Sequence, residues 1–190
     1  MSRVDDSDEA LINRYGRGDV TAFATLYRRH EMRVWRYIKR NVGSRAIADE
    51  LMQEVWFAVA REAPRFKLTA RFTAWLFTIA RNRVIDALRA MRRQVSLDAL
   101  GQEGSAMLEQ LTTGTDVGPL AAVVVRDQAS ALALAIAQLP EDQRDAFLLQ
   151  VEGDLSVEEV AAITRSPFET TKSRLRYARA KLRVLLSEYA

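Results

Sequence analysis

The sequence predicts an all-α protein made of two small helical domains that a flexible linker joins. Apolar residues recur at three- and four-residue spacing in two blocks, helix-capping residues precede these runs, and a stretch rich in Gly, Ser, Thr and acids separates them. No segment alternates apolar and polar residues as a half-buried strand does. The predicted bounds are 1–93 and 119–190 for the two domains and 94–118 for the linker.

The first two predicted helices have clear start and stop signals. Ser7 or Asp8 can begin the first helix, and Gly18 ends it. Asp19 can cap a longer second helix, which Gly43 ends. The apolar residues that keep helical spacing in the second helix are Phe23, Leu26, Tyr27, Val34 and Ile38.

Two further helices complete the first block. Ser44 caps the third helix, residues 45 to about 62, and Pro64 breaks it. A loop over residues 65–71 leads to the fourth helix, residues 72 to about 93. We expect Ile47, Leu51, Val55 and Val59 to face inward in the third helix, and Trp75, Leu76, Ile79 and Leu88 to do so in the fourth, with Trp75 a core residue.

The linker sets how far apart the two domains can act. About 25 residues of flexible coil span roughly 25 to 30 Å. A radius of gyration of about 12 Å for each flanking domain extends the reach to about 50 to 55 Å. For comparison, two turns of a B-form DNA duplex cover about 70 Å, so the two domains are expected to reach points separated by a length of one to two such turns.

Residues 153–183 are predicted to form two short helices, and the second has a cationic face. Ser156 with Glu159, and Ser166 with Glu169, each match the capping-box pattern, and Pro167 suits a first helical turn. This is the pattern of a helix-turn-helix that places its second helix in a DNA groove. The expected buried residues are Val157, Val160, Ala161, Ile163, Leu175, Ala178, Leu182 and Leu185. The expected exposed residues are Lys172, Ser173, Arg174, Arg176, Arg179, Lys181 and Arg183.

Charge in the last part of the chain is divided along the sequence. Acids gather before the predicted turn and bases follow it. Such polarity orients one face toward a polyanion and offers the other to a protein. The acids are Glu141, Asp142, Asp145, Glu152, Asp154, Glu158 and Glu159.

Several classes of site and location are excluded or disfavoured. The chain has no cysteine, which excludes disulfides and thiolate zinc sites and fits a reducing cytoplasm. No run approaches about 20 apolar residues, so no membrane insertion is expected, and the polar, acidic start lacks a signal peptide's apolar core. We find no catalytic motif and expect no enzyme, no cofactor, no metal site and no small-molecule substrate. The single histidine, His30, is expected to be an ordinary helix-face residue.

The ordered set of motifs resembles the extracytoplasmic-function (ECF, group 4) sigma factors of bacterial RNA polymerase. Similar to region 2 of that family are Asp8-Glu-Ala-Leu, Gly18-Asp-Val-Thr-Ala-Phe, Leu26-Tyr-Arg-Arg-His, Ala48-Asp-Glu-Leu-Met-Gln-Glu-Val-Trp and residues 72–86. Similar to region 4 are Leu139-Pro-Glu-Asp-Gln-Arg, Leu155-Ser-Val-Glu-Glu-Val-Ala and Lys172-Ser-Arg-Leu-Arg-Tyr-Ala-Arg. The resemblance implies a factor that binds core RNA polymerase and directs promoter-specific initiation.

The resemblance also implies residue roles. Contacts with core polymerase are expected from Asp49, Glu50, Leu51, Gln53 and Glu54. Capture and holding of the opened −10 element are expected from Arg65, Phe66, Lys67, Leu68, Arg71, Arg81, Arg83 and Arg89. Reading of the −35 duplex is expected from Arg165, Thr170, Lys172, Ser173, Arg174, Arg176 and Arg179, with Lys172 and Arg176 nearest the bases.

Two departures and two alternatives accompany this interpretation. Arg165 stands where many relatives have Gly, and Glu169-Thr170-Thr171 replaces Gly-Thr-Val, so the promoter sequence does not follow. An anti-sigma factor is a partner implied by family likeness alone. The alternatives are a stand-alone helix-turn-helix regulator, which would bind duplex DNA without polymerase, and a sigma-like decoy that sequesters an anti-sigma factor.

Overall fold

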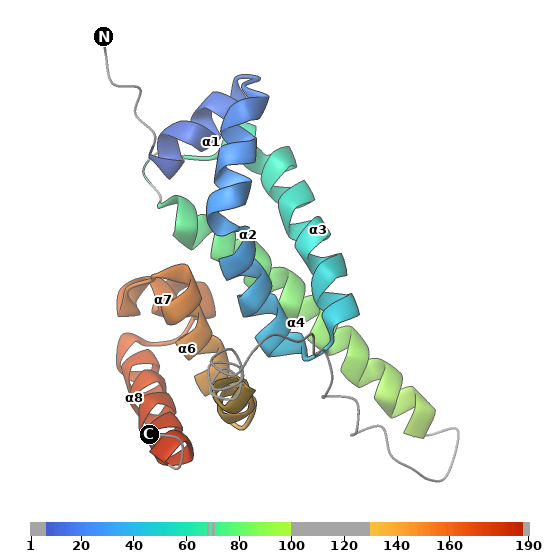
Figure 1. Ribbon diagram of the computed structural model, residues 1–190, viewed down its shortest axis with the longest axis vertical. Coiled ribbons are helices and arrows are strands. Elements are labelled where there is room, and N and C mark those ends of the chain that lie inside the picture. The colour runs from blue at the N-terminus through green and yellow to red at the C-terminus, as the bar shows by residue number, and fades with distance from the viewer. Residues whose placement is uncertain (1–6, 68, 70, 100–129, 188–190) are drawn as a thin grey trace, which may run out of the picture.

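The computed structural model describes residues 7–67, 69, 71–99 and 130–187, and all regular elements in these residues are helices (Figure 1). Residues 7–99 form the N-terminal bundle, and residues 130–187 form the C-terminal domain. The two pack side by side, with α6 against α2. The prediction of an all-α chain with two helical domains is confirmed.

Capping residues set the helix bounds of the N-terminal bundle. Its elements are α1 (Asp8–Gly16), α2 (Val20–Val42), α3 (Arg45–Glu62), the 3-10 turn η1 (Ala63–Arg65) and α4 (Phe72–Ala99). The side chains of Ser7, Asp19 and Ser44 each accept hydrogen bonds from backbone amides of the turn that follows. Gly43 ends α2 at a φ of 77°, a value that favours glycine. These starts and stops match the sequence prediction.

The bundle core lies where α2, α3 and α4 face one another. Leu26, Val34 and Ile38 from α2 are fully buried against Val55 and Val59 from α3. Trp75 is half-buried and packs against this core, as expected for a core residue rather than an exposed platform. The apolar spacing of the sequence therefore identified the inward faces.

Helix α4 is longer than the sequence indicated. It continues to Ala99, whereas we expected it to end near Arg93 and the linker to begin at residue 94. Residues 94–99 lack Pro and Gly, so no helix breaker stands where composition alone suggested a boundary. The rest of the expected linker, residues 100–118, lies outside the described residues.

The C-terminal domain is built from a helical segment at residues 130–137 and from α6 (Glu141–Gly153), α7 (Val157–Thr164) and α8 (Phe168–Leu186). Ser156 and Glu159 form the expected capping box at the start of α7. The matching prediction for Ser166 and Glu169 is wrong, because Pro167 holds the N-cap position of α8 and no side chain caps that helix.

An aromatic pair of the N-terminal bundle lies against the C-terminal domain. Tyr37 of α2 and Phe77 of α4 are fully buried, with ring centroids 5.5 Å apart in an edge-to-face arrangement. A Cβ atom on Gly153 would come within 2.8 Å of Leu155 and 3.4 Å of Phe77. Glycine at the end of α6 therefore leaves room for the Leu155 side chain, at a position that lies beside Phe77.

Candidate nucleic-acid and polymerase interfaces

The outward face of α3 presents an acidic surface. Asp49, Glu50, Gln53 and Glu54 are exposed there, whereas Leu51 is 6% exposed and lies in the core. Leu51 was counted among the polymerase contacts, but its burial means that it holds the helix in place. The Trp35 indole N–H donates a hydrogen bond to Asp49 at 2.7 Å, which fixes one carboxylate of this face.

An apolar groove lies beside these carboxylates. It encloses about 320 Å³ between α2 and α3, and the Phe57 side chain at its edge is 74% exposed. The sequence pattern did not single out Phe57, although it follows Gln53 and Glu54 at helical spacing on the same outward face. An exposed aromatic next to charges is a frequent feature of protein interfaces. The other residues that line the groove are Phe23, Tyr27, Met52, Gln53, Trp56 and Ala60.

The loop before α4 is partly anchored. The Phe66 ring lies 5.1 Å from the ring of Trp75 and is half-buried, while Arg65 and Lys67 are exposed. Arg71 donates hydrogen bonds to the Glu159 carboxylate at 2.9 Å and to the backbone oxygen of residue 154 at 3.3 Å. Leu68, one of the predicted −10 residues, lies outside the described residues.

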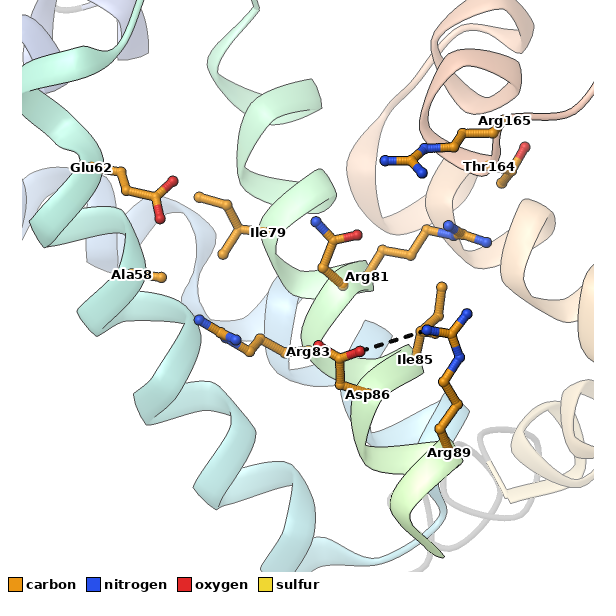
Figure 2. Close-up of a pocket in the computed structure, with 11 residues that line it drawn as sticks. Ala58, Glu62, Ile79, Arg81, Arg83, Ile85, Asp86, Arg89, Thr164 and Arg165 are labelled. Atoms are coloured by element: carbon orange, nitrogen blue, oxygen red, sulfur yellow. Dashed lines mark ion pairs between the residues drawn. The ribbon is translucent and has the colours of Figure 1, made fainter. Parts of the chain in front are cut away.

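The arginines of α4 line a cleft of about 580 Å³ between α3, α4 and the turn before α8 (Figure 2). Arg81, Arg83 and Arg89 reach this cleft from α4, and Arg165 reaches it from the C-terminal domain. Residues predicted to contact the −10 element and a residue predicted to contact the −35 element therefore line the same cleft. Its acidic lining residues are Glu62 and Asp86, and Asp86 lies 3.9 Å from Arg89.

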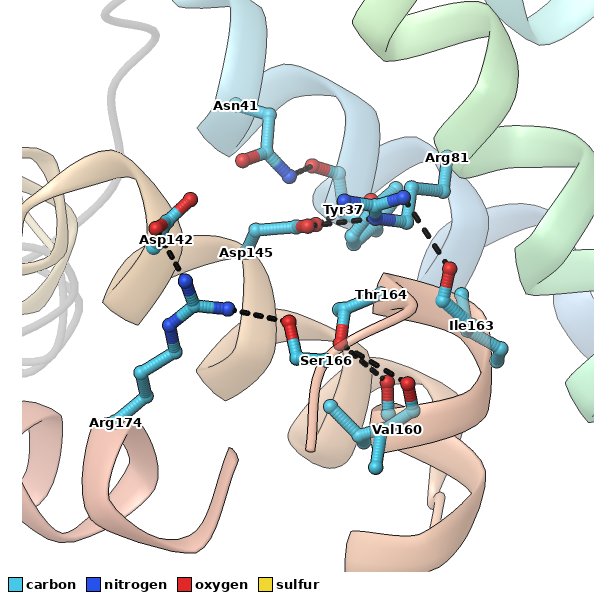
Figure 3. Close-up of polar contacts among 11 residues, drawn as sticks. Tyr37, Asn41, Arg81, Asp142, Asp145, Val160, Ile163, Thr164, Ser166 and Arg174 are labelled. Carbon is cyan, nitrogen blue, oxygen red and sulfur yellow. Dashed lines mark hydrogen bonds and ion pairs between the residues drawn. The ribbon is translucent and has the colours of Figure 1, made fainter. Parts of the chain in front are cut away.

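Arg81 differs from its neighbours because it crosses between the domains. It donates to the Asp145 carboxylate at 2.7 Å and to the backbone oxygen of Ile163 at 3.2 Å (Figure 3). Tyr37 donates its hydroxyl hydrogen to the other oxygen of Asp145 at 2.8 Å. Burial, together with the negative charge of Asp145, raises the pKa of Tyr37 well above its usual range, so this hydroxyl stays protonated.

Glu152 is the second acid that joins the domains. Its side chain is 4% exposed and pairs with Arg36 at 2.9 Å and with Arg40 at 2.7 Å, while Arg33 donates to its backbone oxygen at 2.7 Å. Arg92 and Glu141 also form an ion pair across the interface. We call this set of interdomain pairs the interdomain ion cluster: Arg36, Arg40, Arg71, Arg81 and Arg92 with Glu141, Asp145, Glu152 and Glu159.

Helices α7 and α8 form the predicted helix-turn-helix. Arg165 occupies the turn with a φ of 53°, the left-handed conformation in which many relatives would place Gly. Its backbone N–H contacts the last carbonyls of α7, which ends that helix. The turn therefore keeps its geometry despite the larger residue.

The predicted −35 residues divide into two groups on α8. Thr170, Lys172, Arg176 and Arg179 are exposed, and Ser173 is half-buried. Arg174 instead donates to the Ser166 hydroxyl at 2.7 Å and to Asp142 at 2.5 Å, with its side chain 27% exposed (Figure 3). Arg174 thus ties α8 to the turn and to α6, a role that the sequence pattern did not reveal.

His30 lies in the interior of the N-terminal bundle. It is 3% exposed, and its Nε2 lies 2.6 Å from the Asp8 carboxylate, which Arg29 also contacts at 2.8 Å. Burial raises the pKa of Asp8, but the hydrogen bonds from His30 and Arg29 outweigh it and leave that pKa below its usual value. His30 therefore anchors α1 to α2.

The described residues contain no cluster of three or more His, Asp or Glu side chains that could hold a metal ion. Among the same residues, no helix is both long enough and apolar enough to cross a membrane.

Comparison with known proteins identifies both domains. Residues 26–94 match the family model "Sigma-70 region 2", and residues 129–182 match "Sigma-70, region 4". The chain is 35% identical over 172 residues to the ECF RNA polymerase sigma factor RpoE of Cereibacter sphaeroides, covering 89% of this chain and 88% of that protein. The chain belongs to the ECF sigma factors of the sigma-70 family.

Further relatives agree with this assignment. The ECF RNA polymerase sigma factor SigW of Bacillus subtilis is 28% identical, with 93% of this chain and 95% of that protein covered. The solved structure of RpoE with the anti-sigma factor NepR from Bartonella quintana matches with a TM-score of 0.69 and 25% identity, over 88% of this chain and 98% of that one. The structure of CnrH with the cytosolic domain of CnrY matches in fold, with a TM-score of 0.67, 21% identity and coverage of 96% and 99%.

As an ECF sigma factor, the protein directs transcription initiation with core RNA polymerase at promoters and is not itself an enzyme. The interpretation of the sequence as a sigma factor is confirmed, and the two alternatives, a stand-alone regulator and a decoy, are set aside. The expectation for individual contact residues stays a prediction.

Proposed function

We propose that this sigma factor uses three separate surfaces for its three tasks. The acidic face of α3 docks on core polymerase through Asp49, Glu50, Gln53 and Glu54, and the exposed Phe57 adds an apolar contact. Acidic side chains on a rigid helix suit a basic partner surface, and an aromatic at the edge of a groove is a typical anchor.

The −10 element is assigned to the basic residues before and along α4. Arg65 and Lys67 are exposed beside Phe66, and Arg83 and Arg89 line the cleft. Cationic side chains next to an aromatic ring suit an opened strand, because they hold phosphates while the ring contacts a base. Arg71 and Arg81 belong to the same set once their interdomain partners are released.

The −35 element is assigned to the exposed side chains on the first turns of α8. Thr170, Lys172 and Arg176 lie there, in the helix-turn-helix position that enters a major groove. Arg179, further along the helix, donates to Gln150 at 2.5 Å and suits a phosphate contact. Arg174 supports the reading helix from behind.

The observation that carries this proposal is the segregation of charge. The outward face of α3 is acidic, while α4 and α8 carry exposed arginines and lysines. A protein partner and a polyanion are thereby kept on different surfaces. We also propose that the protein acts in the cytoplasm and that an anti-sigma factor binds it, because a solved relative is a complex with such a factor.

Run-off transcription with purified core polymerase on a promoter library tests these assignments. Lys172→Ala with Arg176→Ala should reduce promoter-specific initiation while polymerase binding stays normal. The matched control, Lys181→Ala with Arg183→Ala, removes the same charge from the far part of α8 and should have a much smaller effect. Initiation that survives the first pair on every template would reject the assigned reading residues.

Titration of labelled core polymerase tests the α3 surface. Asp49→Ala with Glu50→Ala should weaken polymerase binding, whereas Glu62→Ala, on the same helix but away from that face, should bind as the wild type does. Equal binding by all three proteins would place the polymerase contact elsewhere.

A further inference from the structure

The first amide of α4 is capped by a residue from another helix. The Arg71 backbone oxygen accepts the first helical bond of α4, from the Trp75 amide at 3.1 Å, but the Arg71 side chain carries only donors and cannot cap the free amides. The Glu9 carboxylate of α1 accepts a hydrogen bond from the Phe72 amide at 2.7 Å instead. A negative charge at this end of a helix also interacts favourably with the helix dipole.

The same helix also lies against the start of the loop that precedes α4. We call residues 65–71 the −10 loop; it begins in η1, and α1 contacts both η1 and α4 (Figure 1). A Cβ atom on Gly16, the last residue of α1, would lie 3.4 Å from the Ala63 carbonyl oxygen and 3.4 Å from the Pro64 Cα atom. One short helix therefore touches the chain just before the −10 loop and just after it.

Helix α1 is itself fixed to α2. Asp8, the residue before Glu9, contacts the His30 Nε2 atom at 2.6 Å and the Arg29 guanidinium at 2.8 Å. The centroid of the buried His30 ring lies 5.3 Å from that of the Phe72 ring. Consecutive acids of α1 therefore hold two neighbours, because Asp8 binds α2 and Glu9 binds the start of α4.

The start of α4 determines where the Phe66 ring lies. This ring packs on Phe72 and Trp75, with centroid distances of 6.3 Å and 5.1 Å. Fraying of the first turn of α4 would move both rings and would release Phe66, together with the exposed cations of Arg65 and Lys67 beside it in the chain. A ring that contacts an unstacked base binds it more tightly when the ring is already held in place, since ordering a side chain on binding costs affinity.

We propose that Glu9 is a positioning residue for capture of the −10 element: from α1 it caps α4 and thereby holds the Phe66 ring of the −10 loop in place for an unstacked base. The inference rests on the proposed function, since Glu9 has this task only if the −10 loop contacts DNA. Glu9 acts through the loop and does not touch the strand. Its loss should therefore remove the part of binding that depends on a base, whereas a general loss of stability would weaken all binding alike.

Binding of single-stranded −10 oligonucleotides to the sigma factor assembled with core polymerase tests the proposal. An oligonucleotide with the −10 sequence that the promoter library yields is compared with copies in which each base in turn is replaced by an abasic sugar. For the wild type, the most sensitive abasic site should weaken binding about tenfold, the loss expected when one base no longer stacks on an aromatic ring. Glu9→Ala should bind the intact oligonucleotide about tenfold more weakly and should no longer distinguish that abasic copy.

Further variants separate positioning from stability. Glu9→Gln keeps an oxygen that can accept the bond from the Phe72 amide, so it should retain base discrimination. Ser44→Ala removes the side-chain cap of α3 at the end of that helix away from the −10 loop, so it should lose stability without losing discrimination. Thermal unfolding followed by circular dichroism measures the stability of each variant. If Glu9→Ala does not fold, Glu9→Asp takes its place, because its shorter side chain draws the carboxylate away from the amide.

The outcomes distinguish this inference from the assignment on which it rests. If Glu9→Ala and Ser44→Ala affect affinity and discrimination equally, Glu9 is not a positioning residue, and the −10 assignment stands. An equal loss of discrimination in Glu9→Gln and Glu9→Ala would overturn the capping role. If Arg65→Ala with Lys67→Ala leaves oligonucleotide binding unchanged, the assignment of the −10 loop fails, and the role of Glu9 fails with it.

Discussion

Both domains contribute basic side chains to the surfaces that we assign to DNA, yet they hold these side chains differently. On α8, Lys172, Arg176 and Arg179 are exposed, and their nearest polar partners belong to the same domain. On the N-terminal bundle, Arg71 and Arg81 are bonded to acids of the other domain. Whether an arginine is available to bind DNA therefore depends on the acidic partners that the fold places beside it. For Arg71 and Arg81 these partners are distant in the sequence.

The largest contrast is expected in stability. Arg81→Ala should lower the free energy of unfolding by about 3 kcal/mol, because it leaves Asp145 poorly solvated beside Tyr37. Arg176→Ala removes the same side chain from an exposed position and should change stability by less than about 0.5 kcal/mol. Urea denaturation of the two variants measures this difference, and similar values would remove the distinction between the two domains.

For binding of duplex DNA we expect the reverse, with the large effect at the exposed residues of α8. Arg176→Ala with Lys172→Ala should weaken binding of polymerase holoenzyme to a duplex −35 element by about 2 kcal/mol, since base contacts contribute roughly 1 to 3 kcal/mol each. Competition binding at several salt concentrations measures this loss. A loss confined to low salt would indicate phosphate contacts alone and would move these residues out of the reading role.

A smaller effect distinguishes the two serines of the helix-turn-helix. Ser156→Ala removes a capping hydroxyl and should destabilise the C-terminal domain by about 1 kcal/mol. Ser166→Ala removes only a hydrogen-bond acceptor for Arg174, so it should lower the free energy of unfolding by less than about 0.5 kcal/mol. Thermal unfolding of both variants provides the test, and equal costs would restore a capping role to Ser166.

The smallest expected effect is on how the stability of the N-terminal bundle depends on pH. Hydrogen bonds from Thr21 and Arg14 lower the pKa of Asp19 from 3.8 to about 2. Because the folded pKa lies below the unfolded one, the charged carboxylate stabilises the fold fully above about pH 4, and this stabilisation is lost as the pH falls toward 2. Wild type and Asp19→Asn should therefore differ in stability at pH 6 and converge near pH 2. A constant difference across this range would contradict the assignment.

Local signals predicted much of the fold. Ser7, Asp19, Ser44 and Ser156 cap helices as expected, because a cap depends on residues within one turn. The Ser166 pattern failed because Pro167 took the capping position. A match to a local pattern therefore predicts a cap only where the neighbouring residues permit its geometry.

Long-range partners could not be predicted from the sequence. Burial of His30 depends on Asp8 from another helix, and pairing of Arg81 with Asp145 joins residues 64 positions apart. The division of acids and bases in the last segment did indicate a face offered to a protein. The structure shows that the N-terminal bundle of the same chain occupies that face through Asp145 and Glu152.

The hydrogen bond from Trp35 to Asp49 has a practical consequence. An indole changes its emission when the acceptor of its N–H is taken away or its surroundings become drier. Asp49 lies on the surface that we assign to polymerase, so docking there would alter the environment of Trp35. The protein thus carries an intrinsic optical reporter of assembly, which a Trp35→Phe variant would silence.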